Sequence, residues 1–346
     1  MQAKNADWLD LVQEQALEPE LPICDPHHHF WDRRDVMVQP RYLLDEILTD
    51  LGGGHRVVST VYVECGAMYR CGGTPRTRVV GETEFVNGLA AMAASGLYGE
   101  TQIAAAIVGT APLDEGDGVA ATLDAQIAAS PARFRGIRHV VAWDESPETP
   151  IARAAPPPGL MASDAFRAGF RHLAPRGLTF DLWCYHPQLS EAVDLVRAFP
   201  DQTVILDHFG GPLGVGPYAN RADEVFDDWR ERMVELAECP NVVAKLGGIN
   251  MEVNGFGWHG RSRPPYSWEL MEATRRYYET MIELFGVNRC MFESNFPVDK
   301  VSCSYTVLWN SFKRLVAGAS EDEKRALFHD TATRVYRIQP SATPSD

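Results

Sequence analysis

The stretch Asp25-Pro26-His27-His28-His29-Phe30-Trp31-Asp32 decides the fold of this chain, and it follows a short apolar run at residues 21–24. The apolar run indicates a strand that ends in a loop here. Because side chains alternate between the two faces of a strand, His27 and His29 are expected to point one way and His28 the other. Two imidazoles on one face could bind a metal ion or polarise a carbonyl group, whereas His28 is expected to be structural.

Length and charge narrow the class of protein. A chain of 346 residues fits a single large barrel with insertions, and 45% apolar residues is ordinary for a globular protein. The net charge of −15 argues against a nucleic acid or an anionic membrane surface as partner, because phosphates would be repelled. A small anionic substrate stays open, since a few arginines can reverse the potential inside a cleft.

Cysteine usage and the N-terminal residues indicate the compartment. The seven cysteines are scattered and odd in number, which favours reduced thiols in a cytoplasmic protein over a disulfide framework. Residues 1–20 show no basic start followed by an apolar stretch, so no secretory signal is visible. No run approaches the roughly 20 apolar residues that a membrane span needs.

Short apolar runs recur along the chain, and each is followed by a segment with helical periodicity. The expected strands cover residues 21–24, 57–64, 102–108, 134–141, 178–185, 203–207, 242–246 and 289–293. Eight such units predict a parallel sheet with helices outside it, closed into an α/β fold of the (β/α)₈ TIM barrel type. An open doubly wound sheet is disfavoured, because the glycine-rich phosphate fingerprint is missing after the first strand.

The barrel is expected to span residues 21–338, with loop insertions. Residues 1–20 are then an N-terminal extension and residues 339–346 a C-terminal tail. Barrels of this kind often pair through their outer helices or loops, which leaves a homo-oligomer open.

Ionisable side chains gather where the predicted strands end, which is where barrels of this type carry their chemistry. In chain order these side chains are His27, His29, Glu64, Arg138, His139, His186, His208, Lys245, Glu293 and the amide Asn295. A lone histidine at a strand end is more often a hydrogen-bonded structural group. The whole constellation would converge on one mouth of the barrel, and it therefore indicates an active site.

Several motifs together resemble a known family. They are Asp25-x-His27-x-His29-x-Trp31, His186, Leu206-Asp207-His208-x-Gly210-Gly211 and Ser294-Asn295-Phe296-Pro297. The chain resembles the amidohydrolase-related (amidohydrolase-2) family, and within it the lactonase-type branch of L-fuconolactonase and 2-pyrone-4,6-dicarboxylate lactonase. The resemblance runs from about residue 21 to residue 338, and it implies a distorted (β/α)₈ barrel that hydrolyses a small cyclic ester or amide.

The resemblance also implies roles for the histidines. His27 and His29 match a pair that ligates a divalent metal in many relatives, and that polarises the substrate carbonyl without metal in the lactonase branch. His186 and His208 match the histidines of the fifth and sixth strands. The family thus implies either no cofactor or one divalent ion, zinc or manganese, held by His27, His29 and His186.

One position departs from the family pattern. The usual Ser-Asp-x-Pro motif, whose aspartate accepts a proton from the attacking water, here carries Asn295, and an amide is neither a base nor a good metal ligand. Three interpretations remain. Another carboxylate replaces the aspartate, Glu293 first and Glu64 or Asp25 after it; a histidine is the base; or the barrel binds a ligand without catalysis.

Substrate contacts are expected from Trp31, Glu64, Arg138 and Lys245, and arginines would suit an anionic substrate through bidentate hydrogen bonds. The leading hypothesis is a hydrolase that opens a small lactone of a sugar acid or of an aromatic-degradation intermediate. A metal-dependent, non-oxidative decarboxylase on the same fold is the alternative reaction, and a non-catalytic binding barrel is the alternative class. A fold alone does not name the substrate.

Overall fold

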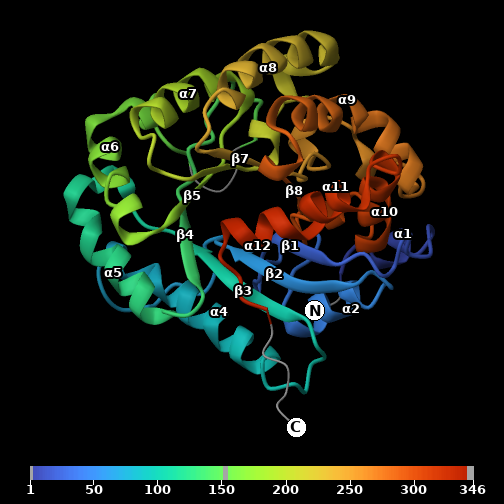
Figure 1. Ribbon diagram of the computed structural model, residues 1–346, viewed down its shortest axis with the longest axis horizontal. Coiled ribbons are helices and arrows are strands. Elements are labelled where there is room, and N and C mark those ends of the chain that lie inside the picture. The colour runs from blue at the N-terminus through green and yellow to red at the C-terminus, as the bar shows by residue number, and fades with distance from the viewer. Residues whose placement is uncertain (1–2, 151–154, 341–346) are drawn as a thin grey trace.

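Eight parallel strands form the centre of the molecule, and helices surround them (Figure 1). The computed structural model describes residues 3–150 and 155–340. The strands are β1 (Ile23–His28), β2 (Val57–Val63), β3 (Gln102–Gly109), β4 (Phe134–Arg138), β5 (Thr179–Leu182), β6 (Val204–Leu206), β7 (Val242–Leu246) and β8 (Cys290–Phe292). They lie in sequence order in one sheet, which confirms the predicted (β/α)₈ barrel.

The barrel closes just beyond the last strand. The amide of Asn295 donates to the carbonyl oxygen of His27 (2.9 Å), and the amide of His29 donates to that of Phe296 (2.8 Å). These bonds continue the parallel pairing from β8 to β1. They place the motif at residues 294–297 directly beside the histidine run, which the sequence separates from it by more than 260 residues.

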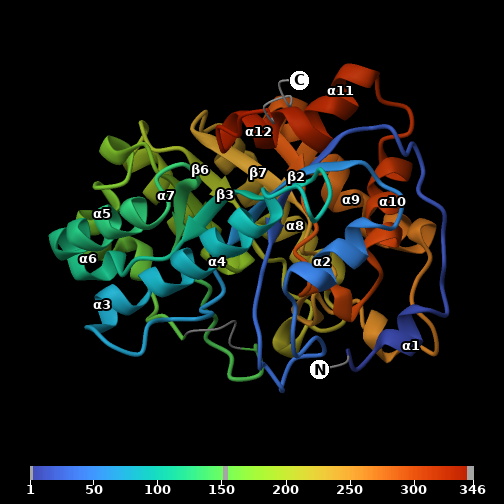
Figure 2. The ribbon, with the colours of Figure 1, turned by 90° about the horizontal axis from the view of Figure 1, so that it is seen from below.

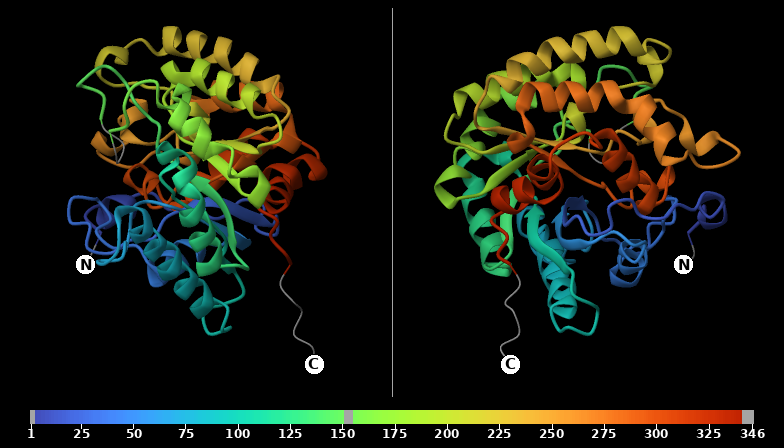
Figure 3. Two further views of the ribbon diagram at one scale, coloured as in Figure 1. Left: turned by 90° about the vertical axis from the view of Figure 1, so that its left-hand side faces the viewer. Right: turned by 45° about the vertical axis from the view of Figure 1, so that its right-hand side comes forward.

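The helices pack outside the sheet, as two further views show (Figure 3). They are α1 (Ala6–Leu9), α2 (Leu44–Leu51), α3 (Pro75–Arg78), α4 (Val80–Ala93), α5 (Ala120–Ala129), α6 (Asp164–Phe170), α7 (Leu189–Ala198), α8 (Ala222–Ala237), α9 (Ser267–Phe285), α10 (Tyr305–Leu315), α11 (Glu321–Arg325) and α12 (Thr331–Val335). Aromatic pairs join the two layers, such as Phe170 with Phe180 (4.9 Å between ring centroids) and Phe292 with Phe312 (4.7 Å). No helix among the described residues is long and apolar enough to cross a membrane.

Helix α12 covers the end of the barrel at which the strands begin (Figure 2). Its Ala332 and Val335, with the following Tyr336, join the apolar cluster inside the barrel that includes Val61 and Val243. The Tyr336 hydroxyl donates to Asp181 Oδ2 (2.7 Å) on β5. The barrel interior is therefore a packed core, and the site lies at the opposite end.

The N-terminal extension packs against the barrel. Glu14 accepts hydrogen bonds from the Ser267 amide (2.8 Å) at the start of α9 and from Asn310 Nδ2 (2.9 Å) on α10. Lys313 of α10 donates to the carbonyl oxygens of Leu17 (2.7 Å) and Glu18 (2.9 Å). The domain limits stay a prediction, and most of the predicted tail, residues 341–346, lies outside the described residues.

Candidate active site

A cavity of about 680 Å³ opens at the end of the barrel where the strands finish. Of the residues predicted for the site, those that line it are His29, Trp31, Arg138, His208 and Asn295. We call His29, Arg138, His208 and Asn295 the floor of the cavity. The floor residues are almost entirely buried, so each needs partners inside the protein.

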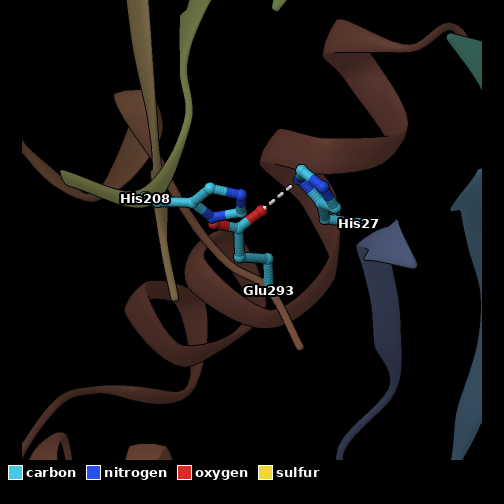
Figure 4. A group of neighbouring side chains, drawn as sticks. All are labelled: His27, His208 and Glu293. Carbon is cyan, nitrogen blue, oxygen red and sulfur yellow. Dashed lines mark hydrogen bonds and ion pairs between the residues drawn. The ribbon is translucent and has the colours of Figure 1, made fainter. Parts of the chain in front are cut away.

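Below the floor, Glu293 lies between two imidazoles (Figure 4). Its Oε1 is 2.7 Å from His208 Nδ1, and its Oε2 is 2.8 Å from His27 Nδ1. Glu293 and His27 are fully buried, whereas His208 reaches the cavity. Glu293 therefore does not line the cavity itself and is connected to it through His208.

The backbone around this pair is specialised. A Cβ atom on Gly248 would lie 2.1 Å from His208 Nδ1, and one on Gly247 would lie 2.1 Å from the Glu293 carbonyl oxygen. Only glycine allows β7 to turn this close to the pair. His208 (φ 53°) and Asn295 (φ 55°) both hold left-handed backbone, a strained conformation that clusters at functional sites.

Lys245 provides a fixed charge inside the barrel. Its Nζ lies 2.6 Å from Asp181 Oδ2, 3.1 Å from Asp207 Oδ1 and 3.2 Å from His27 Nδ1. Burial alone would lower the pKa of Lys245, but the attraction of Asp181 and Asp207 outweighs it and raises that pKa. The ammonium group is therefore charged throughout the physiological range.

Arg138 places a cation at the cavity itself. Its Nε donates to Glu64 Oε1 (3.0 Å), and its guanidinium also contacts the Glu64 carbonyl oxygen and Asp207 Oδ2 (3.5 Å). Its Nη1 lies 3.3 Å from His27 Nε2. Burial, and after it the positive charge of Lys245, hold the pKa of His27 well below its usual range. Burial and the positive charge of Arg138 lower the pKa of His29 in the same way. Both imidazoles are neutral at pH 7.

A buried carboxyl lies next to Asn295. Asn295 Oδ1 is 3.3 Å from His29 Nε2, and its Nδ2 donates to Asp299 Oδ1 (2.9 Å). Burial raises the pKa of Asp299 from 3.8 to about 7. Asp299 follows Asn295 by four residues, and this closeness to the motif at residues 294–297 is the sequence signal that could have indicated it.

The Asp299→Asn variant should change how stability depends on pH. The folded state keeps the Asp299 proton up to about pH 7, while the unfolded chain loses it near pH 3.8. The folded state thus binds more protons between these values, and its free energy of unfolding falls as pH rises, by up to about 1.4 kcal/mol per pH unit from this group. The variant should lack this component in urea unfolding between pH 5 and 8. Parallel profiles would contradict the assignment, and Asp223→Asn on α8 is the control.

His186 lies apart from the residues it was predicted to join. Strand β5 ends at Leu182, four residues earlier, so the chain has left the barrel mouth before His186. Its Nδ1 accepts a hydrogen bond from the Leu213 amide (3.2 Å), and its ring packs on Tyr218 (5.0 Å between centroids). His186 does not line the cavity.

The candidate metal ligands differ accordingly from the predicted His27, His29 and His186. Among the described residues, the one group of such donors whose atoms all lie within 4.8 Å of one another is His27, His208 and Glu293. His29 is outside this group; its Nδ1 lies 2.8 Å from the Val63 carbonyl oxygen and its Nε2 lies 3.3 Å from Asn295 Oδ1.

Other residues predicted for the site also do not line the cavity. Lys245 and Glu64, predicted to bind substrate, are buried beneath it and hold Asp181 and Arg138. His139 lies beyond the end of β4 and borders a smaller separate cavity. His28 points away as predicted, with its Nε2 2.9 Å from Thr60 Oγ1. Residues that line the cavity without being proposed as substrate contacts include Arg34 and Tyr185.

A barrel with acids, bases and cations around a cavity at its strand ends belongs to the class of barrel enzymes. Residues 24–338 match the Amidohydrolase family, and the chain belongs to this family of hydrolases. A protein of Sinorhizobium fredii, y4mH, is 32% identical over 92% of this chain and 99% of its own length. An L-fucono-1,5-lactonase of Burkholderia ambifaria is 26% identical over 80% of this chain and 81% of that protein, which agrees with the lactonase-type branch.

Solved structures share the fold. A zinc-bound amidohydrolase from Burkholderia multivorans aligns with a TM-score of 0.67 and 23% identity, covering 92% of this chain and 99% of that one. A protein from Pseudomonas putida proposed to be a 2-pyrone-4,6-dicarboxylic acid hydrolase gives 0.58 and 19%, covering 92% and 98%. A manganese-bound 5-carboxyvanillate decarboxylase from Novosphingobium aromaticivorans gives 0.57 and 11%, covering 94% and 100%.

Proposed function

We propose that this protein opens the ring of a small lactone, with His208 as the general base that activates water. The observation that carries the proposal is the pair of His208 Nδ1 and Glu293 Oε1, 2.7 Å apart at the floor of the cavity. A carboxylate on one ring nitrogen holds the imidazole in place and leaves the other nitrogen to accept a proton. The pair supplies the base that Asn295 cannot be.

The remaining floor residues suit the binding of the lactone and of its carbonyl oxygen. The guanidinium of Arg138, fixed by Glu64, is a permanent cation beside the cavity and stabilises the negative charge that develops on the carbonyl oxygen. His29 and Asn295 orient the ring as neutral hydrogen-bonding groups. The charges are in place before substrate binds, so little reorganisation is needed during the reaction.

The bonds then change in two stages. His208 removes a proton from a water molecule while the oxygen of that water bonds to the carbonyl carbon of the lactone. Glu293 stabilises the resulting imidazolium of His208. The tetrahedral intermediate collapses, the ring carbon–oxygen bond breaks, and His208 returns the proton to the departing oxygen. The product is the open hydroxy acid.

Acid release from a panel of sugar, alkyl and aryl lactones, followed with a pH indicator, tests the proposal. Hydrolysis of at least one of them, lost in the His208→Asn variant, supports it. If no lactone in the panel is hydrolysed while carbon dioxide is released from aromatic acids, the decarboxylase alternative replaces it. If neither reaction occurs and ligands only bind, the non-catalytic alternative holds.

We also propose that His27, His208 and Glu293 can hold one divalent ion, zinc or manganese. Two imidazoles and a carboxylate suit such ions, and Glu293 Oε2 is buried and accepts no hydrogen bond from the described residues, although His27 Nδ1 lies 2.8 Å away. The related barrels from Burkholderia multivorans and Novosphingobium aromaticivorans contain zinc and manganese. When bound, the ion would supply Lewis acidity and lower the pKa of bound water.

Calorimetric titration of chelator-treated protein with zinc or manganese should show one binding event per chain. Glu293→Gln should abolish it, because an amide is a poor ligand. The His186→Asn variant is the matched control and should bind as the wild type does, since His186 lies outside the donor group. Loss of binding in His186→Asn, with retention in Glu293→Gln, would restore the ligand set first expected from the sequence.

A further inference from the structure

We propose that the cavity selects lactones that carry aromatic or alkyl substituents and disfavours polyhydroxylated sugar lactones. This inference rests on the proposed lactone hydrolysis and names the substrate class for the same cavity. It departs from the sugar lactones for which related proteins, such as the L-fucono-1,5-lactonase, are named.

Two tryptophans flank the histidines of the floor. Trp31 stacks on His29, with 6.2 Å between ring centroids and 24° between planes. Trp183 meets His208 edge-on, at 4.8 Å and 76°. Trp31 follows β1 and Trp183 follows β5, and these strands are four apart in an eight-stranded barrel. The reacting ring is thus bordered by aromatic surface on two opposite sides, which suits a flat apolar ring.

An apolar cluster continues this surface away from the floor. Val140, Trp183 and Tyr185 belong to a cluster separate from the main core, and the partly buried Met251 and Val253 pack against it. All five line the cavity, and we call them the wall. The wall presents alkyl and aromatic groups to whatever part of the substrate lies beyond its carbonyl.

Polar groups that line the cavity beside Trp31 and at the wall are already bonded within the protein. Trp31 Nε1 donates to the Gln39 carbonyl oxygen (2.7 Å), and Gln39 Nε2 donates to Asn5 Oδ1 (2.8 Å). The Tyr185 hydroxyl donates to the Pro150 carbonyl oxygen (3.0 Å). Sugar hydroxyls at the wall would therefore leave water without gaining good partners, whereas an apolar ring would gain by leaving it.

The charged residues that line the cavity above the floor do not reverse this preference for apolar substituents. Arg34 donates to the Cys65 carbonyl oxygen (2.6 Å), and its guanidinium lies over the Trp31 ring at 4.9 Å from the centroid. Glu252 is exposed and stays hydrated. The polar groups aimed at the substrate are those of the floor, which match one ester group and not a ring of hydroxyls.

The test compares two lactones with the same six-membered ring. δ-Decalactone carries an alkyl chain, and D-glucono-1,5-lactone carries hydroxyl groups. We expect kcat/KM, divided by the rate of hydroxide-catalysed hydrolysis of the same lactone, to be about 10²-fold higher for δ-decalactone. An equal or higher value for the glucono-lactone would overturn the inference and leave the proposed function standing.

A second measurement keeps the inference testable if neither lactone is hydrolysed, an outcome that counts against the proposed function. Calorimetry then compares the unreactive lactams 3,4-dihydro-2-quinolinone and D-glucono-δ-lactam. Tighter binding of the aromatic lactam supports the apolar substrate class. Tighter binding of the glucono-lactam, or no binding of either, overturns it.

A wall variant locates the effect. Val253→Asn should lower kcat/KM for δ-decalactone by about fivefold, since a partly buried apolar contact is lost. It should lower the value for D-glucono-1,5-lactone by less. Val234→Asn on α8, an exposed valine away from the cavity, is the control and should change neither. Equal losses for both lactones in Val253→Asn would contradict an apolar wall.

Discussion

Replacing His208 by asparagine is expected to lower kcat for lactone hydrolysis by at least about 10²-fold, because a general base typically contributes that much or more. Asparagine is the suitable substitute, since it tolerates the left-handed backbone that His208 adopts (φ 53°). The loss should appear in kcat with little change in KM, as expected for a group that acts in the transition state. Steady-state kinetics with circular dichroism as a check on folding measures both.

Variants of Glu293, the partner of His208, and of His186, the control, complete this prediction. Glu293→Gln should lower kcat by about 10²-fold as well, because an amide cannot stabilise the imidazolium of His208. His186→Asn, a buried histidine outside the cavity, should stay within about twofold of the wild type. If Glu293→Gln keeps kcat within about twofold, the His208–Glu293 pair is not the base, and Asn295→Asp then tests whether a carboxylate there changes the pH profile.

Lys245→Met should destabilise the protein by about 3–5 kcal/mol, because removing one partner of a buried ion pair leaves uncompensated charge. Asp181 and Asp207 lie 2.6 Å and 3.1 Å from the ammonium group, and all three side chains are fully buried. Urea unfolding followed by fluorescence gives the free energy of unfolding.

Two further variants test the cause of that loss. Lys245→Met combined with Asp181→Leu should recover part of the stability, because both charges of one buried pair are then removed. Arg221→Gln, which breaks an exposed ion pair with Glu224 on α8, should leave the free energy of unfolding unchanged. A loss in Lys245→Met no greater than in Arg221→Gln would show that the buried charge is not needed.

The barrel could be predicted because its signals are local. Each strand is a short apolar run followed by a helical period, and the ends of the parallel strands must share one mouth. That reasoning brought His29, Trp31, Arg138, His208 and Asn295 to the cavity. It failed where strand ends had to be known to within a few residues. Strand β5 ends at Leu182 and not near residue 185, so His186 lies four residues beyond the strand and does not line the cavity.

How deep each strand-end side chain lies inside the barrel could not be predicted in the same way. Lys245 and Glu293 occupy strand ends as expected, but they point below the cavity and pair with buried charges. Which carboxylate meets which cation depends on how far each strand is shifted along its neighbours, and the sequence does not state that register. An aspartate inside an apolar strand, such as Asp181 within residues 179–182, was nevertheless a visible sign of a buried cation.

Tyr336, which follows helix α12, links the closed end of the barrel to the cavity. Contacts run without interruption from Tyr336 to Asp181, Lys245, His27, Glu293 and His208. The charges beneath the cavity are therefore held in part from the end of the barrel opposite to the cavity, and side chains connect the two ends.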